Sequence, residues 1–472
     1  MISLSLFFTS FFLYFITLAP SITTVDTPEF VSAAYTLGIP HSPGYSLYML
    51  IGHFVTHLPI GDNPAFRMNL LSAVALACTV VLLYHSLLRF VENRWVAVAS
   101  SLIFASSYYV WTIGIIAEVY ALQLMTLAIC IRLAVALWNN PMPRYALSLG
   151  CAFGIAVAMY PASALFAPGM LAVYVSLKIP WRIRILSGGL AILIFFASLL
   201  YFPIRYHANP QVNTVGEFNS QGEFEAVDLS TIDGIIWLLS GRQFQEMFFE
   251  QGINVAEPIN WFLGNFLGIG VVMGVLGLAF WWGKHRSLLW IWLITCSVYT
   301  VFYAVYGADD RQTMFGAVYL LWMIPLAVGF EDVILPLKWR NQIVALISLP
   351  LIFILVNFSH VNLREDNRIP DYAEVLMNEL PRDAVVFGNW RDVMPLYYFQ
   401  VVENRRLDLE LYNLFLFGHD AERIKSVTDN LITQGKVVVF LNNSVPSGYS
   451  TDVLFFQVDP FTKEMAIHQI IR

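Results

Sequence analysis

Charged residues are scarce in this sequence. Only 12% of its 472 residues are Asp, Glu, Lys or Arg, and 58% are hydrophobic. Ordinary soluble domains have about 25% charged and about 45–50% apolar residues. The composition therefore excludes an ordinary soluble chain, and the lack of a basic stripe argues against a nucleic-acid partner. We expect an all-α polytopic membrane protein.

Several catalytic and metal-binding patterns are also missing. The four cysteines, Cys78, Cys130, Cys151 and Cys296, lie inside apolar runs without metal-ligand or redox spacing. The G-x-S-x-G, Walker A and G-x-G-x-x-G patterns are absent, which leaves a serine hydrolase, an NTPase or a nucleotide-cofactor enzyme without support. The adjacent Asp309 and Asp310 are more typical of a solvated loop than of a metal pair. We expect no disulfides, no metal and no cofactor.

Apolar runs of membrane-crossing length recur along the first 358 residues. A helix needs about 20 such residues to cross the hydrocarbon core. The candidate spans are about 2–20, 69–90, 94–111, 118–138, 145–160, 162–178, 184–206, 259–282, 287–306, 313–335 and 341–358. The sequence thus predicts about 11 transmembrane helices.

The basic residues of the connecting loops are distributed unevenly between the two sides. With a cytoplasmic N-terminus, the inner loops carry Arg89, Arg94, Arg144, Lys178, Arg182, Arg184, Lys284, Arg286, Lys338 and Arg340. The outer loops of the membrane part carry Arg67, Arg205, Arg242 and Arg311. Cytoplasmic loops are normally the more basic ones, so this asymmetry favours that orientation.

The chain divides into two predicted domains. Residues 1–358 form the transmembrane domain, with large outer loops at about 21–68 and 207–258. Residues 359–472 alternate helical and strand patterns, with strand-like runs such as "KVVVFLNN" and "VLFFQVDP". An odd number of spans places this small α/β domain outside the cytoplasm, and we favour a bacterial plasma membrane over the ER.

The first outer loop, "VDTPEFVSAAYTLGIPHSPGYSLY" (25–48), combines acidic residues with turn residues close to the first span. Pro28 suits the first turn of a helix that begins near Asp26, and the helix dipole favours Glu29 there. A second amphipathic helix along the membrane surface is expected after the "HSPGY" turn. Asp26 is either a helix cap or a functional carboxylate, and His41 is either a polar turn residue or part of a site.

The segment "DTPEFVSAAYTLGIPHSPGYSLYMLIGHFVTHLPIGDNPAFRMNLLSA" closely resembles the opening of the protein O-mannosyltransferase-like family of GT-C glycosyltransferases. Looser matches are "IAEVYAL" (116–122), "GRQF" (241–244) and the run that begins "YAEVLMNELPRDAVVFGNW". The chain departs from the family at Pro28, where a small residue is usual, and at "HSPGY", where the family has Pro-Pro-Gly.

The resemblance implies a GT-C-like fold and an inverting hexosyltransferase. Such an enzyme moves a sugar, for example mannose, from a polyprenyl-phosphate donor to a protein or glycan acceptor on the outer face. Asp26 would then accept the proton of the acceptor hydroxyl, because it lies just outside the first span, where the donor phosphate meets water. Glu29, one turn further, is expected to orient Asp26 or to bind a sugar hydroxyl.

The leaving lipid phosphate needs a fixed cation, and arginine can bond two phosphate oxygens at once. Arg205, Arg242 and Arg311 are the candidates, although each is alternatively an anchor at the membrane interface. Glu118 is either a functional acid or a solvated loop residue. The matching segments add His41, Tyr45, Tyr120 and Gln243 as expected substrate-binding residues.

Three other functions remain open at this stage. A transporter would also have many spans, but the central spans carry almost no charge for a midplane site. A GT-C enzyme with another substrate would use the same fold, since loop variation changes the activity. A non-catalytic membrane scaffold would bind a partner through its C-terminal domain but would not need the acidic first loop.

Overall fold

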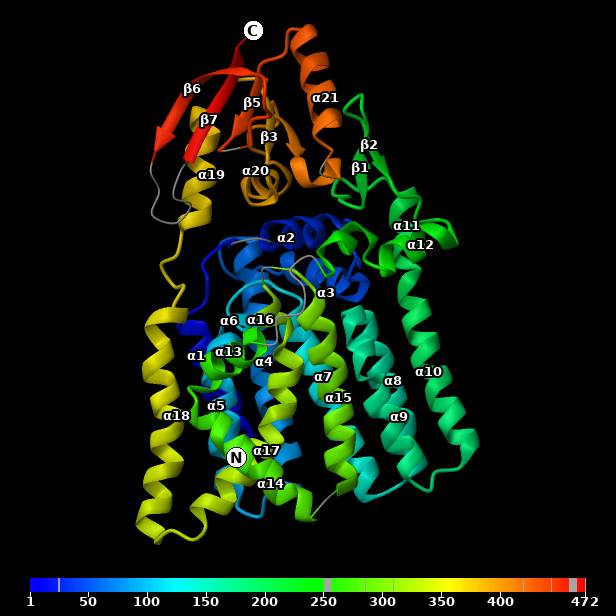
Figure 1. Cartoon of the computed structure of the whole chain (residues 1–472), viewed down its shortest axis with the longest axis vertical. Helices are drawn as coiled ribbons and strands as arrows, with labels where there is room; N and C mark the ends of the chain where they lie inside the picture. The colour runs from blue at the N-terminus through cyan, green and yellow to red at the C-terminus, as the bar shows by residue number, and fades with distance from the viewer. Residues whose placement is uncertain are drawn as a thin grey trace.

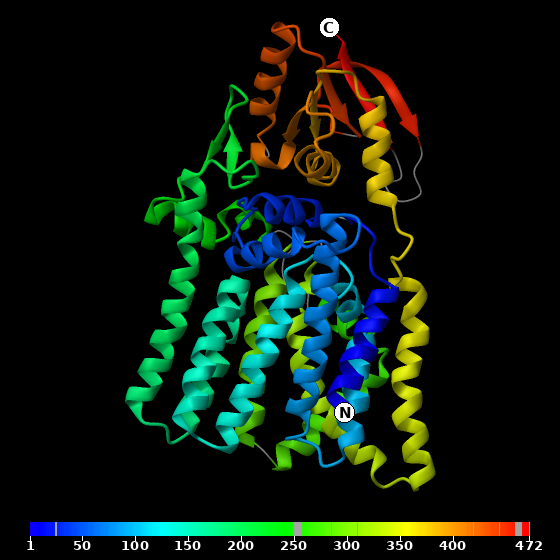
Figure 2. The same ribbon diagram turned by 180° about the vertical axis from the view of Figure 1, so that it is seen from behind.

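The computed structural model describes residues 1–23, 26–249, 256–284, 286–308, 310–418, 420–442, 444–457 and 465–471. A bundle of long helices forms one end of the molecule and a small α/β unit forms the other (Figure 1). Short helices lie crosswise between them, as the reverse view also shows (Figure 2). The N-terminus lies in the helical bundle, and the C-terminus lies at the far end of the α/β unit.

Six described helices are long and apolar enough to cross a membrane, or up to seven if a bent pair counts as one span. They include α4 (Pro64–Leu87), α7 (Tyr120–Asn139), α15 (Arg286–Val305), α17 (Gly316–Ile334) and α18 (Trp339–Val361), and α10 (Trp181–Leu199) continues into α11 (Tyr201–His207). Shorter apolar helices are α1 (Ile2–Ile16), α5 (Arg94–Ser106), α8 (Pro143–Met159) and the run of η1 (Pro161–Phe166) with α9 (Ala167–Ser176). The multi-pass membrane architecture is therefore supported, but helix length alone does not establish all of the expected spans.

The expected single span at 259–282 is instead a broken helix. The structure has α13 (Ala256–Phe266) and α14 (Ile269–Lys284), and their axes differ by 107°. Leu267 and Gly268 between them have φ values of 51° and 68°. A right-handed helix cannot continue through two residues in this left-handed conformation. The apolar composition of the run did not reveal this break.

Two helices occupy the first outer loop, as expected. They are α2 (Thr27–Thr36) and α3 (Ser46–Thr56), and they lie across the outer ends of the bundle (Figures 1 and 2). Every residue from 27 to 34 is buried, because α20 (Trp390–Glu403) of the α/β unit packs against α2. Helix α2 therefore lies beneath the α/β unit and not on an open membrane surface.

The second outer loop connects the two parts of the molecule. It contains the hairpin β1 (Gly216–Phe218) and β2 (Phe224–Ala226), then α12 (Ile232–Leu239) and η2 (Arg242–Met247). Arg423 of the α/β unit forms an ion pair of 3.0 Å with Glu217 of β1. The Tyr412 hydroxyl donates a hydrogen bond of 3.2 Å to the Gly222 carbonyl in the hairpin turn. The hairpin thus fixes one side of the α/β unit to the loop below it.

The α/β unit contains a five-stranded sheet with the order β4-β3-β5-β7-β6. The parallel strands are β3 (Val385–Gly388), β4 (Glu410–Asn413) and β5 (Val438–Leu441), and β6 (Ser450–Gln457) and β7 (Met465–Ile471) are antiparallel. Helices α19 (Arg368–Glu379) and α21 (Ala421–Thr433) complete the unit, with η3 (Leu414–Phe417) after β4. Strands lie where "AVVFGNW", "LDLELYNL", "KVVVFLNN" and "VLFFQVDP" predicted them.

The carboxyl ends of β3 and β4 lie at the same edge of the sheet, because the two strands are parallel and adjacent. Helix α20 follows β3 directly, and η3 follows β4. In α/β sheets, ligands bind outside this carboxyl edge. Here Trp390 and Phe415, which follow the two strands, line a cavity that also contacts the membrane helices.

Candidate active site

The cavity between the bundle and the α/β unit has a volume of about 810 Å³. Its polar lining includes Asp26, His41, Ser42, Tyr120, Asp310 and Arg391. Aromatic side chains from both parts of the molecule complete the wall, among them Tyr45, Tyr160, Phe244, Tyr303, Tyr306, Trp390 and Phe415. The space is large enough for a sugar together with parts of a second substrate, since ligand pockets are typically about 300–1,000 Å³.

Asp26 lies at the start of α2 but does not cap it through its side chain, because no cap hydrogen bond is formed. The carboxylate lies on the cavity wall, and its side chain is 21% exposed. Burial raises the pKa of Asp26 to about 7; the positive charge of His41 opposes this rise, and the negative charges of Asp310 and Glu29 add to it. A carboxyl group with this pKa exchanges protons readily near neutral pH, as a general base must.

Glu29 lies one helical turn further and is fully buried behind His41, outside the cavity lining. It accepts a hydrogen bond of 2.8 Å from the His41 backbone N–H, and it also bonds the His41 ring at Nδ1 and the Thr214 hydroxyl. These contacts use both carboxylate oxygens. Glu29 therefore reaches the cavity only through His41.

His41 lies between two carboxyl groups. Its Nε2 is 4.0 Å from Oδ2 of Asp26 and 3.3 Å from the Tyr45 hydroxyl. Burial alone lowers the pKa of His41, but the charges of Glu29 and Asp26 and the hydrogen bond from Glu29 outweigh it and raise the pKa to about 9. His41 is therefore a cation at neutral pH, and it stabilises the ionised form of Asp26.

Asp26, Glu29 and His41 also form the one described group whose potential metal-ligand atoms all lie within 4.8 Å of one another. Both oxygens of Glu29 already accept hydrogen bonds from His41 and Thr214. That no metal is required stays a prediction.

The other residues that were expected to bind substrate lie on the cavity wall, behind it, or buried in the protein. Tyr45 and Tyr120 line the cavity. Gln243 lies behind the wall, where its Oε1 accepts from the Ser42 backbone N–H (3.1 Å) and its Nε2 donates to the Thr214 carbonyl (3.0 Å). Glu118 is buried, and its Oε2 has no hydrogen-bond partner within the described ranges. It is therefore not a solvated loop acid.

None of the three predicted arginines lines this cavity. Arg205 donates to the Leu37 carbonyl at 2.6 Å and so holds the end of α2. Arg311 is buried in an ion pair of 2.8 Å with Glu257. Arg242 lines a neighbouring hollow of about 470 Å³, which shares Ser240 with the main cavity.

Two cavity residues were missed by the sequence analysis. Arg391, at the start of α20, contributes a cation to the wall. Asp310, which was assigned to a solvated loop, lies on the same wall and accepts a hydrogen bond of 2.8 Å from the Tyr120 hydroxyl. Asp309 lies outside the described residues. A signal for Arg391 was present, since it follows a strand-like run, but its distance from Asp26 depends on tertiary structure.

Comparisons with known proteins identify the first part of the chain. Residues 26–181 match the family described as "Protein O-mannosyl-transferase TMEM260 N-terminal domain". The mouse protein O-mannosyl-transferase TMEM260 is 23% identical over 436 residues, which cover 84% of this chain and 60% of the mouse protein. The Dictyostelium discoideum protein of that name is 25% identical over 168 residues, which cover 32% of this chain and 20% of that protein. The chain thus matches less than two thirds of either relative.

Solved structures resemble the whole chain. ArnT from Cupriavidus metallidurans, bound to undecaprenyl phosphate, has a TM-score of 0.64 at 10% identity and covers 98% of this chain and 97% of its own. The oligosaccharyltransferase AglB from Archaeoglobus fulgidus, in complex with an inhibitory peptide and a dolichol-phosphate, has a TM-score of 0.56 at 9% identity, covering 98% and 74%. At these identities the likeness concerns the fold alone. Residues 26–181 therefore resemble the TMEM260 protein O-mannosyl-transferase N-terminal domain, and the chain shares the fold of the GT-C glycosyltransferases ArnT and AglB.

Proposed function

We propose that the protein is a membrane glycosyltransferase that moves a sugar from a polyprenyl-phosphate donor to a protein or glycan acceptor, with Asp26 as the base. The observation that carries this proposal is the Asp26 carboxyl group, which faces the large cavity, has a pKa of about 7 and lies beside the cationic His41. The names of the relatives support the reaction class, with mannose as the leading sugar. The undecaprenyl phosphate bound by ArnT supports the donor class.

The proposed reaction is a single inverting displacement. Asp26 takes the proton of the acceptor hydroxyl while the acceptor oxygen bonds to C1 of the sugar. The bond from C1 to the phosphate oxygen breaks, and its electron pair leaves with the lipid phosphate. Correct placement of such a base contributes about 10²–10⁴-fold to the rate. His41 acts as a positioning residue in this scheme, since its Nε2 lies 4.0 Å from Asp26, and Glu29 acts through His41, which it binds.

A direct assay tests the proposal. Sealed membrane vesicles with the α/β unit on the outside receive polyprenyl-phosphate donors labelled in mannose or in another sugar, together with acceptor protein. We expect label to move from the lipid to the acceptor without permeabilisation, which also tests the proposed outer position of the α/β unit. Movement of intact labelled lipid across the membrane without transfer would instead favour a transporter, and no movement of either kind would favour a scaffold.

Arg391 is the cation that we propose for the donor phosphate. It lies on the cavity wall at the start of α20, whose N-terminal dipole also favours an anion. A hydrogen bond to a charged group contributes about 1.5–3 kcal/mol. We therefore expect Arg391→Gln to raise the KM for the donor by about 10–100-fold, with folding retained because the side chain is exposed.

The matched control is Arg242→Gln, which removes the same charge from the neighbouring hollow. Donor titrations with both variants decide between the two residues. A larger rise in KM for Arg242→Gln than for Arg391→Gln would move the phosphate site to Arg242, one of the three arginines that the sequence offered.

A further inference from the structure

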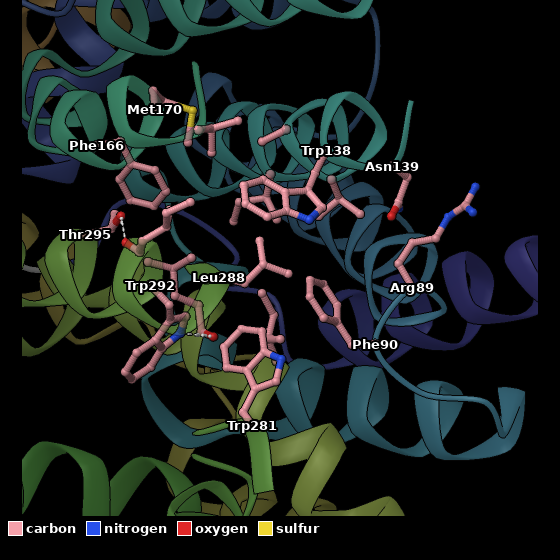
Figure 3. A pocket seen from close by; sticks show the side chains of 17 residues that line it. Arg89, Phe90, Trp138, Asn139, Phe166, Met170, Trp281, Leu288, Trp292 and Thr295 are labelled. Atoms are coloured by element: carbon pink, nitrogen blue, oxygen red, sulfur yellow. Dashed lines mark hydrogen bonds between the residues drawn. The ribbon is translucent and has the colours of Figure 1, made fainter. Parts of the chain in front are cut away.

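A second cavity, of about 160 Å³, lies in the membrane bundle at the end that faces away from the α/β unit. Helices α7, α9, α14, α15 and α17 contribute its walls. Figure 3 shows Arg89 and Asn139 at one end of the cavity, and Phe166, Met170 and Thr295 at the other. We propose that this cavity binds an anionic glycerophospholipid from the membrane leaflet on this side.

The depth of the cavity suits the acyl chain of one leaflet. It reaches from the inner ends of α4 and α7 to Thr295, which lies nine residues beyond Arg286, the first residue of α15. At 1.5 Å per residue this distance is about 14 Å, close to half of the hydrocarbon core of about 30 Å. A chain from the near leaflet would fill this depth, whereas a polyprenyl chain descending from the candidate active site would have to enter from the other leaflet.

Away from Arg89 and Asn139, the wall of the cavity is almost entirely apolar, with Phe166, Leu288 and Trp292 among its residues. The polar groups there are already used within the protein. Trp292 Nε1 donates to the Leu321 carbonyl at 2.9 Å, and the Thr295 hydroxyl donates to the Ile291 carbonyl at 2.8 Å. This part of the cavity therefore offers a hydrocarbon chain an apolar wall without unmet hydrogen-bonding groups.

The indole N–H of Trp281, in contrast, is not used within the protein. The side chain is buried, with 2% exposure, and its Nε1 donates no hydrogen bond within the part of the chain that the structure describes. A buried donor without a partner is unfavourable, because it has lost its bond to water and gained none in return. Trp281 lines the cavity and packs against Phe90 with the two rings 5.5 Å apart. An ester or phosphate oxygen of a bound lipid would provide the missing acceptor.

Arg89 provides the charge at the mouth. Its side chain is exposed, lies on the cavity lining and forms no ion pair with any described residue. Arg286 is also on this side, exposed and stacked 5.5 Å over the Trp282 ring. A basic side chain near the membrane surface attracts anionic lipid headgroups. The anionic phosphate would lie at Arg89, one acyl chain would extend toward Phe166, and the glycerol ester would lie near Trp281.

The test uses the full-length protein in detergent, with dioleoyl-phosphatidylglycerol or dioleoyl-phosphatidylcholine added. Native mass spectrometry measures how much lipid is bound, and thermal unfolding measures the stabilisation. We expect the wild-type protein to bind phosphatidylglycerol in preference to phosphatidylcholine and to gain a few degrees in unfolding midpoint. Arg89→Gln should reduce this preference about tenfold, and Trp281→Phe should weaken the binding of both lipids.

Two matched controls remove similar groups outside the cavity. Arg340→Gln removes an exposed arginine at the same end of the molecule, and Trp282→Phe alters the neighbouring tryptophan, which is 48% exposed. Both should bind lipid as the wild type does, and all four variants should unfold at the wild-type midpoint without added lipid. Equal phosphatidylglycerol preference in Arg89→Gln and Arg340→Gln would overturn the proposal. Displacement of the bound lipid by undecaprenyl phosphate at equal concentration would overturn it as well, by identifying a polyprenyl site.

Discussion

The Asp26→Asn variant is expected to transfer sugar about 10²–10⁴-fold more slowly than the wild-type protein, with donor binding retained. An amide has nearly the same size as the carboxyl group but cannot accept the proton. The substitution should leave folding unchanged, because the Asp26 side chain forms no cap hydrogen bond that the amide would lose. Single-turnover transfer and donor titration measure the two effects separately.

Asp371→Asn is the matched control, because Asp371 is an exposed aspartate in the first turn of α19, away from the cavity. It should keep wild-type activity. If Asp26→Asn also keeps near-normal transfer, Asp26 is not the base.

The pH dependence of the wild-type enzyme gives an independent check on the same residue. Asp26 acts as a base only when ionised, and its pKa is about 7. We therefore expect kcat/KM to fall as the pH drops below about 7 and to level off above it. This acidic limb should be missing from the residual activity of Asp26→Asn. A limb near pH 4 in the wild-type protein would indicate an ordinary exposed carboxyl group instead.

The Glu29→Gln variant is expected to lose about 3–5 kcal/mol of folding stability, as is typical when one partner of a buried ion pair is removed. Glutamine fits the space but carries no charge, so the buried His41 cation would lose its nearer counter-ion and keep only Asp26, whose Oδ2 lies 4.0 Å from its Nε2. The pKa of His41 should fall for the same reason, and transfer should weaken with it. Thermal unfolding in detergent measures the loss directly.

Two further variants separate stability from chemistry. Glu223→Gln alters an exposed glutamate of the outer loop and should have little effect. Adding His41→Gln to Glu29→Gln removes the unpaired cation and should restore part of the lost stability. If Glu29→Gln is instead as stable as the wild type but inactive, Glu29 and not Asp26 would be the reacting carboxylate.

Local patterns in the sequence were sufficient to predict much of the outer loop. Pro28 and the "HSPGY" turn predicted one helix that begins near Asp26 and a second after the turn, and helices α2 (Thr27–Thr36) and α3 (Ser46–Thr56) lie there. The break at Leu267 and Gly268 was not predicted, because apolar composition reports the length of a run and not its direction. The burial of α2 was also missed, since it results from contact with α20, more than 350 residues away in sequence.

In the candidate site, too, local sequence patterns predicted some residues, whereas others depend on tertiary contacts. Asp26, His41, Tyr45 and Tyr120 belong to segments with recognisable patterns, and all four lie on the cavity wall. Arg391 and Asp310 reach the wall only because distant segments fold together, so no spacing along the chain relates them to Asp26. Arg205 and Arg311 show the converse. Each is an arginine in a predicted outer loop, as the phosphate site requires. The guanidinium group of Arg205, however, donates to a backbone carbonyl, and that of Arg311 donates to a backbone carbonyl and pairs with Glu257.

Because the carboxyl edge of the sheet supplies its own part of the cavity wall, that part can change separately from the part supplied by the membrane helices. Asp26 and His41 come from the membrane part, whereas Trp390, Arg391 and Phe415 come from segments that follow β3 and β4. Segments after strand ends tolerate sequence change well, because the strands keep their pairing whatever follows them. Evolution or design could therefore vary this part of the cavity wall through two short segments, while the carboxylate and its histidine partner stay as they are.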